Sequence, residues 1–174
     1  SGAHRRLPPF PPRRSSDLRA LSETGRAVAD DPDVRVVVLS GEGRCFSAGL
    51  DTSNFAAMAG GGSVGTAGGG RRMFDKPEGS VANYAQQPGW IWRDLPIPVI
   101  AAVHGVAYGA GLQIALGADI RFVAPHARMS VMESKWGLIP AMSGTHTLRT
   151  LVRPDGPKDL PLTGRLFSRS AAGR

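Results

Sequence analysis

The stretch "PVIAAVHGVAYGAGLQIALGADIRFVAP", residues 98–125, carries the clearest fold signal in this chain of 174 residues. Its first eight residues form an apolar run that stops at Gly105, which predicts a buried strand. Residues 108–119 open with glycines and continue with Leu, Ile and Ala, which predicts a helix. Residues 120–125 form another apolar run that ends in proline. This strand–helix–strand order favours an α/β fold with mostly parallel, buried strands.

The segments on both sides extend this pattern. Residues 34–41, "VRVVVLSG", are nearly continuous in apolar β-branched residues, as expected of a strand that is covered on both faces. A helix is expected before them, capped by Ser16 or Asp17 and stopped by "DDP" at 30–32. The remaining expected elements are a short helix within 83–95, a strand at 127–133, a helix that starts near Ser143, and a last strand within 162–168.

Composition suggests where the domain begins and ends. Residues 1–16 are rich in proline and arginine, which predicts a disordered leader. Residues 17–168 are expected to form a partial domain, followed by a tail at 169–174. Within the domain, residues 59–82 contain seven glycines between 60 and 70, so a flexible loop is expected there. This loop is either a plain linker or a lid over a site, and the sequence leaves both readings open.

The formal net charge of +7 raises the question of nucleic-acid binding. The first 26 residues hold six arginines against Asp17 and Glu23, and residues 149–174 hold six basic against two acidic groups. The intervening segment is nearly neutral. A nucleic-acid-binding domain usually presents its basic groups on one face of the folded body. We therefore expect no nucleic-acid partner.

Other features bear on the cellular compartment. No apolar run approaches the length of a membrane span, and no secretory signal pattern is present. The single cysteine, Cys45, excludes an internal disulfide, which suits a reducing compartment. A cytoplasmic location without membrane association is expected. Cys45 is interpreted as a small core residue, because no histidine lies near it in the sequence as a partner for a nucleophile.

Two glycine-containing bends suggest chemistry. The first is "SAGLD", residues 47–51, directly after one strand, and the second is "HGVAYGAG", residues 104–111, between another strand and a helix. Glycines allow sharp bends and close approach to main-chain atoms, and a helix start offers free N–H groups. Two such N–H groups from neighbouring strands could hold one oxygen atom, which is the arrangement of an oxyanion hole.

Alternative sites find little support. The dinucleotide pattern G-x-G-x-x-G fails because Ile114 stands at the third glycine position, and no P-loop pattern occurs. The nucleophile pattern G-x-S-x-G fails at Ala141. The four histidines have no ligand spacing, so no metal site is expected. Glu133 remains a candidate acid–base group, because a carboxylate at the end of an alternating apolar strand is costly to bury unless it is paired or used. A structural ion pair is the alternative for this residue.

In these stretches the sequence resembles the crotonase family, also called the enoyl-CoA hydratase/isomerase superfamily. The matching segments are "VRVVVLSGEGRCFSAGLD", "PIPVIAAVHGVAYGAGLQIALGADIRFVAPHARMSVMESKWGLIP" and "SGTHTL", in this order. The resemblance covers about residues 18–170. It implies a crotonase-like ββα spiral that binds an acyl-CoA thioester, with coenzyme A as part of the substrate and no separate cofactor. The implied activity is that of a lyase or isomerase of fatty acid metabolism.

The resemblance also implies site residues. The thioester oxygen would lie between the backbone N–H groups of Leu50 and Ala110, with Glu133 as the acid–base group. The residues implied in substrate binding or in supporting the bends are Ala48, Asp51, Gly109, Gly111 and Gln113. Trp136 and Met142 are interpreted as pocket or core residues, with core favoured.

This chain departs from the family pattern at two positions in the site. Gln113 stands where hydratases of this family place a second glutamate, and an amide cannot take up a proton. Ala141 stands where dienoyl-CoA isomerases place an aspartate. A single glutamate could still move a proton between two carbon atoms of an enolate. The alternative reading is a catalytically inactive acyl-CoA binder or a fragment.

The ends depart from the family pattern as well. The resemblance implies a strand hairpin before the first helix and a C-terminal helical region that completes the pocket and a homotrimer or dimer of trimers. Both are absent from this chain, so truncation at both ends is expected. A chain without these parts should expose strand edges and apolar surface, and is therefore expected to be poorly stable or prone to aggregate.

Overall fold

The fold was obtained as a computed structural model, which describes residues 15–49, 66–67, 71–72, 74–152 and 159–168. Its elements, in chain order, are α1 (Ser15–Ala29), β1 (Val37–Ser40), β2 (Thr66–Ala67), β3 (Arg71–Arg72), α3 (Gln87–Asp94), β4 (Val99–Val103), β5 (Val106–Tyr108), α4 (Ala110–Gly117), β6 (Ile120–Val123), β7 (Arg128–Ser130), the 3₁₀-helix η1 (Met132–Trp136), α5 (Gly144–Leu151) and α6 (Asp159–Thr163). No described helix is both long and apolar enough to cross a bilayer.

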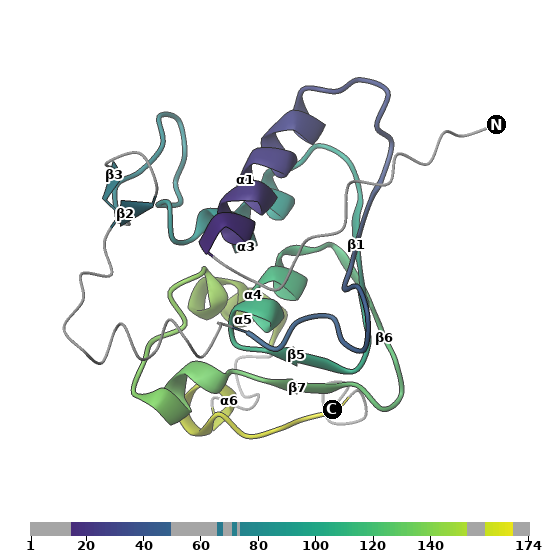
Figure 1. The fold of residues 1–174 in the computed structure, drawn as a ribbon, viewed down its shortest axis with the longest axis vertical. Coiled ribbons are helices and arrows are strands. Elements are labelled where there is room, and N and C mark those ends of the chain that lie inside the picture. The colour runs from purple at the N-terminus through teal and green to yellow at the C-terminus, as the bar shows by residue number, and fades with distance from the viewer. Residues whose placement is uncertain (1–14, 50–65, 68–70, 73, 153–158, 169–174) are drawn as a thin grey trace.

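Two parallel sheets organise the domain. Strands β1, β4 and β6 form one sheet in the order β1-β4-β6, with Val38, Ile100 and Ile120 in register across it. Strands β5 and β7 form a second, two-stranded parallel sheet. In Figure 1 this second sheet crosses the lower part of the molecule, at a steep angle to β1 and β6. The predicted parallel α/β arrangement is thus confirmed, although β5 was expected to be part of a turn.

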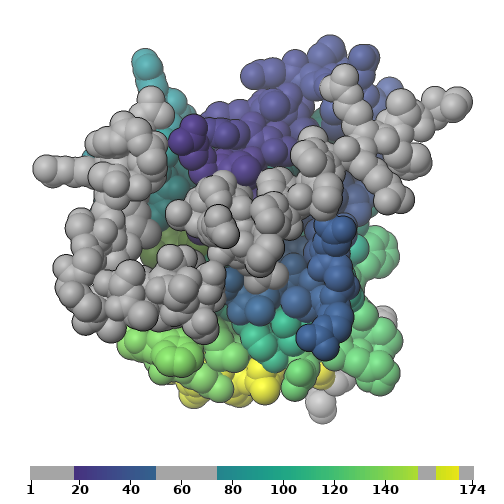
Figure 2. Space-filling view, viewed as in Figure 1, coloured from purple at the N-terminus to yellow at the C-terminus, as the bar shows by residue number. Residues whose placement is uncertain are grey.

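Helices cover one face of the three-stranded sheet. Figure 1 shows α1, α3 and α4 on the same side of β1 and β6, and Figure 2 shows α1, in purple, at the surface at the top of the same view. The residues of β4 that face these helices are Val99, Ala101 and Val103, and all three are buried. They join Leu112 of α4 and Trp92 of α3 in one core cluster. Burial of these apolar groups is the main force that holds the helices on the sheet.

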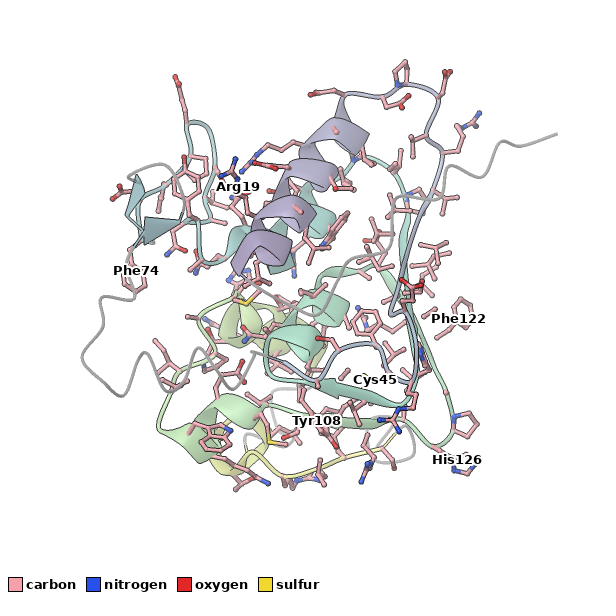
Figure 3. The ribbon with its side chains drawn as sticks, viewed as in Figure 1. Arg19, Cys45, Phe74, Tyr108, Phe122 and His126 are labelled. Carbon is pink, nitrogen blue, oxygen red and sulfur yellow. The ribbon has the colours of Figure 1, made fainter. Side chains whose placement is uncertain are left out.

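The other face of this sheet is open. Val38 of β1 is 61% exposed and Phe122 of β6 is 65% exposed. Figure 3 shows Phe122 projecting from β6 away from the helices. The prediction that the first strand is covered on both faces is therefore wrong for the described part of the chain. A nearly continuous apolar strand indicates that both of its faces tolerate burial. It does not indicate which other segment, if any, covers the second face.

Several element boundaries differ from the sequence-based expectation. The segment predicted as a strand at 127–133 forms β7 and then turns into η1, so Glu133 lies in a 3₁₀-helix instead of a strand. The last predicted strand is reduced to one antiparallel bridge between Met129 and Phe167. Met142 is buried as expected, whereas the core interpretation of Trp136 is wrong, because this residue is 62% exposed.

The expected flexible and terminal segments fall largely outside the described residues. These include the leader up to residue 14, residues 59–65, 68–70 and 73 of the expected loop at 59–82, and the tail at 169–174. Inside the glycine-rich segment, β2 and β3 pair in antiparallel fashion. Helix α1 begins at Ser15, so Ser16 and Asp17 lie within its first turn and the prediction that one of them caps the helix is wrong.

Candidate active site

The two glycine bends lie next to each other in space. The N–H of Ser47 donates to the carbonyl of Val106, and the N–H of Tyr108 donates to the carbonyl of Ser47, at 2.9 and 2.8 Å. The chain that leaves β1 therefore pairs with β5 just before both segments turn. Gly49 has φ 96°, and a Cβ atom placed on it would lie 3.0 Å from the carbonyl oxygen of Tyr108. Glycine is thus required here for both conformation and space.

The second bend ends at the start of α4. Gly109 has φ 51° and ψ −120°, and its N–H donates to the carbonyl of Ser130 at 3.0 Å. Ala110 is the first helical residue, so its N–H has no acceptor within the helix. In the described parts of the chain this N–H donates to no backbone oxygen. It lies at the positive end of the helix dipole, which favours a negatively charged oxygen.

The partner amide of the predicted pair cannot be placed. Leu50 and Asp51 lie outside the described residues, and Ala48 is exposed beside buried Gly49. The role of Leu50 as an oxyanion donor stays a prediction, as do the roles of Asp51 and Ala48. What the structure does establish is that the described end of the first bend lies against the second.

Gly111 lets α4 approach the first bend. A Cβ atom on Gly111 would collide with the side-chain oxygen and the Cβ of Ser47. Ser47 is itself 6% exposed. No local pattern singles out Ser47, since its contact with Gly111 joins segments that are far apart in the chain.

Glu133 and Gln113 meet in the interior beside this bend. The side-chain amide nitrogen of Gln113 donates a hydrogen bond to Glu133 Oε1 at 2.5 Å. A Cβ atom placed on Gly109 would lie 3.3 Å from the same oxygen. The structure therefore brings Gly109, Gln113 and Glu133 together, with Ala110 next to Gly109 in the chain, and the roles of these residues in a site stay predictions.

The second carboxylate oxygen of Glu133 has no partner among the described residues. Glu133 is 9% exposed, and its Oε2 atom is buried with no hydrogen bond. Burial raises the pKa of Glu133 above its ordinary value of 4.5, while hydrogen bonds from its own backbone and from Gln113 oppose the rise. No ion pair of Glu133 is found among the described residues, so the structural ion-pair alternative gains no support.

The orientation of Gln113 is fixed from its other side. The N–H of Gly144, at the start of α5, donates to Gln113 Oε1 at 2.8 Å. The amide oxygen is thus occupied, and the amide nitrogen must face Glu133. A Cβ atom on Gly144 would lie 2.6 Å from Gln113 Oε1, so this approach needs glycine. Gly144 was missed at the level of sequence, because no local pattern links it to a residue 31 positions earlier.

Other candidate groups have structural explanations. Asp119 Oδ2 accepts a hydrogen bond from the backbone N–H of Val99 at 2.9 Å, which ties the end of α4 to β4. Cys45 is half-buried beside the first bend and is labelled in Figure 3. Within the described ranges, no group of three or more potential metal-binding side chains occurs.

The fold and this buried glutamate–glutamine pair define an α/β protein whose candidate site lies at two adjoining strand exits. Residues 19–174 match the profile of the enoyl-CoA hydratase/isomerase family, and the chain belongs to this family. It is 32% identical over 141 residues to a probable enoyl-CoA hydratase of Bacillus subtilis (strain 168), covering 79% of this chain and 49% of that protein. It is 33% identical to a carnitinyl-CoA dehydratase of Salmonella arizonae, covering 89% of this chain and 54% of that protein.

Solved structures agree with this assignment. The crystal structure of a probable enoyl-CoA hydratase/isomerase from Mycobacterium abscessus matches with a TM-score of 0.71 and 32% identity, covering 92% of this chain and 55% of that one. The crotonase-like fold expected from the sequence is thus confirmed. The chain spans about half the length of the relatives that it matches.

Proposed function

We propose that this chain is an acyl-CoA-processing enzyme of the hydratase/isomerase type in which Glu133 alone moves the proton. The observation that supports this most directly is the buried, unpartnered Oε2 atom of Glu133 beside the start of α4. A carboxylate with one oxygen held by Gln113 and the other free has a defined direction in which to accept a proton. The acyl-CoA substrate follows from family membership, and coenzyme A enters as part of the substrate.

The chemistry that suits a single glutamate is the shift of a double bond. Glu133 would take a proton from C2 of a 3-enoyl thioester, and the electron pair would pass to the thioester oxygen. The Ala110 N–H, together with that of Leu50, would stabilise the resulting enolate. The same carboxyl group would return the proton at C4, so that the double bond ends between C2 and C3. Atoms and charges balance without a second acid.

An inactive acyl-CoA binder is the second candidate, and Gln113 favours it. Gln113 occupies the position where the family resemblance implies a second glutamate for the addition of water, and an amide cannot supply or accept that proton. A cytoplasmic location and a trimeric assembly of a longer protein also stay predictions.

One comparison separates the two candidates. Turnover of a 3-enoyl-CoA and of crotonyl-CoA should be measured for the chain and for Glu133→Gln, with thioester binding followed by calorimetry. The enzyme proposal expects isomerisation of the 3-enoyl thioester, little hydration of crotonyl-CoA, and a loss of about 10²–10⁴-fold in rate in Glu133→Gln. Binding without turnover in both forms would favour the inactive binder.

A further inference from the structure

Ser130 is a buried hydroxyl residue that the proposed chemistry does not use. It ends β7, three residues before Glu133, and its exposed fraction is 0%. Its Oγ donates a hydrogen bond to the carbonyl of Gly164 at 2.8 Å, and its own carbonyl accepts the N–H of Gly109 at 3.0 Å. The side chain and the main chain of one residue thus hold two segments that are far apart in the sequence. Since a buried polar group is costly without its partner, loss of either bond should disturb the local structure.

The main-chain bond of Ser130 fixes the bend that carries Ala110. Tyr108 and Ser130 are opposite each other in the pairing of β5 with β7, and the N–H of Gly109 continues this pairing. The carbonyl of Gly109 accepts the N–H of Gln113 at 3.1 Å, so Gly109 is held at both of its polar groups. In a trans peptide the C=O and N–H groups point in opposite directions. The N–H of Ala110 therefore points out of the start of α4, in a direction that depends on Ser130.

The side-chain bond of Ser130 holds the end of α6 against η1. Gly164 directly follows α6 and is buried, with φ 59°. A Cβ atom placed on it would lie 2.8 Å from Ser134 Oγ and 3.0 Å from the carbonyl oxygen of Val131. These two residues lie on either side of Glu133 in the chain, so α6 ends directly against the helix that carries the carboxylate. Figure 1 shows α6 beside the end of β7.

A second contact holds the chain after α6, but it lies farther along. Met129 and Phe167 exchange both backbone hydrogen bonds, at 2.8 and 2.9 Å. This bridge keeps residue 167 beside β7 and leaves the residues between it and α6 to be held by other contacts. The Ser130 hydroxyl acts at Gly164 itself, where α6 touches η1.

We propose that Ser130 is a positioning residue, which sets the placement of the Glu133 carboxylate relative to the Ala110 N–H. Its main chain holds the bend of the oxyanion donor, and its hydroxyl holds η1 in place through α6. The inference rests on the proposed function and adds a residue to it that touches no substrate. A misplacement of about 1 Å can cost roughly 10²-fold in rate, so loss of the hydroxyl should act on kcat more than on KM.

The first measurement needs no turnover. The side-chain amide signals of Gln113 in the ¹⁵N-labelled full chain report its hydrogen bond to Glu133 Oε1, and Gln113→Leu identifies them by their loss. Ser130→Ala should move the hydrogen-bonded amide proton upfield, because η1 is released and this bond weakens. Ser22→Ala is the matched control: Ser22 is also buried and donates to a carbonyl, at 3.1 Å, but within α1. Unmoved Gln113 signals in a folded Ser130→Ala would overturn the proposal.

Kinetics then separate positioning from general loss of stability. On a 3-enoyl-CoA, Ser130→Ala should lower kcat by about tenfold or more and leave KM within about twofold, while Ser22→Ala should change neither. An equal loss of kcat in the two variants, or a change in KM alone, would contradict the assignment. If the unaltered chain does not turn over the thioester, the proposed function fails, and the Gln113 signals alone decide whether Ser130 positions the pair.

A second variant tests the same contact from α6 and keeps the hydroxyl. Gly164→Ala would push a methyl group against η1, whereas Gly79→Ala has the same kind of backbone strain, with φ 72°, and no atom within 4 Å of its added Cβ. Gly164→Ala should therefore move the Gln113 amide signals, and Gly79→Ala should leave them in place. This pair decides the question even if Ser130→Ala does not fold. Identical Gln113 signals in the two glycine variants would show that α6 does not position η1.

Discussion

Gln113 and Glu133 form a short hydrogen bond in the interior, 2.5 Å from the amide nitrogen to Oε1, and each is almost fully buried. Their roles are unequal. Gln113 is held from behind by the Gly144 N–H, so it acts as a fixed donor, whereas Glu133 keeps one oxygen free. Under the proposed function, this pair would select which oxygen of Glu133 reacts. Gln113 is a positioning residue in this arrangement, and Glu133 is the group that would touch the substrate.

The first prediction concerns the pH dependence of activity. A base must be deprotonated to accept a proton, and burial raises the pKa of Glu133. As the pH is lowered, kcat/KM should therefore begin to fall at a higher pH than it would if the base were an ordinary glutamate. A pH–rate profile on a 3-enoyl-CoA checks this, and Glu133→Gln should lose the acidic limb together with most of the rate. An acidic limb centred at or below 4.5 would contradict the assignment.

The second prediction concerns Gln113. Its hydrogen bond lowers the pKa of Glu133, so Gln113→Leu should move the acidic limb of kcat/KM to still higher pH. Gln87→Leu is the matched control, because Gln87 is also a buried glutamine at a helix start but bonds Ser80 and the carbonyl of Ala82 instead. Both variants should lose stability, and only Gln113→Leu should move the limb. If the two variants gave the same pH–rate profile, Gln113 would contribute only to packing and not to the pKa of Glu133.

The third prediction is a pH-dependent gain in stability from Glu133→Gln. Because the folded-state pKa of Glu133 is raised, the folded chain binds this proton more tightly than the unfolded chain. The stabilising contribution is present below the unfolded pKa and is lost as the pH rises through the folded pKa. At neutral pH the charged, buried side chain is unfavourable, so the stability of Glu133→Gln relative to the unaltered chain should be greater at neutral pH than in acid. Chemical denaturation at acidic and neutral pH should show this difference shrinking in acid.

Much of this site could be predicted from local sequence. Gly109 and Gly111 reveal the bend because glycine is needed where backbones approach closely, and the family resemblance implies that Gln113 and Glu133 belong beside it. Residues whose role depends on a partner far away in the chain could not be identified from local sequence. Ser143 and Trp90 each look ordinary in sequence, and only the contact of α5 with α3, through the rings of Trp90 and His146, brings them to one cavity.

The covering of the sheet could not be predicted either. The run at 34–41 shows which residues tolerate burial, but whether Val38 is covered depends on segments outside its own strand. The same reason explains the error at Glu133. Alternation over a few residues is typical of a strand, yet the glycine at 137 in left-handed conformation and the contact to Gln113 favour a turn of 3₁₀-helix.

The fourth prediction tests the contact between α4 and the first bend. Gly111→Ala would place a methyl group against Ser47, so it should destabilise the fold by about 3 kcal/mol or more. Gly43→Ala is the control, since nothing lies within 4 Å of its added Cβ and only its φ of 79° is unfavourable, which costs about 1–2 kcal/mol. Adding Ser47→Gly to Gly111→Ala should recover part of the loss. Thermal unfolding of the four forms measures these differences, and equal losses in the two alanine variants would exclude the steric explanation.

The fifth prediction concerns the open face of the three-stranded sheet. Val38 of β1 and Ile120 and Phe122 of β6 expose apolar surface on the same face, on either side of β4, and apolar surface of this kind promotes association. Phe122→Lys should therefore reduce aggregation, while it should change the free energy of unfolding by only about 0.5 kcal/mol because the ring is mostly exposed. Leu162→Lys is the control, since Leu162 is 77% exposed but lies in α6, outside this face. Light scattering and sedimentation at increasing concentration compare the three forms. If Leu162→Lys improved solubility as much as Phe122→Lys, added charge rather than the sheet face would be responsible.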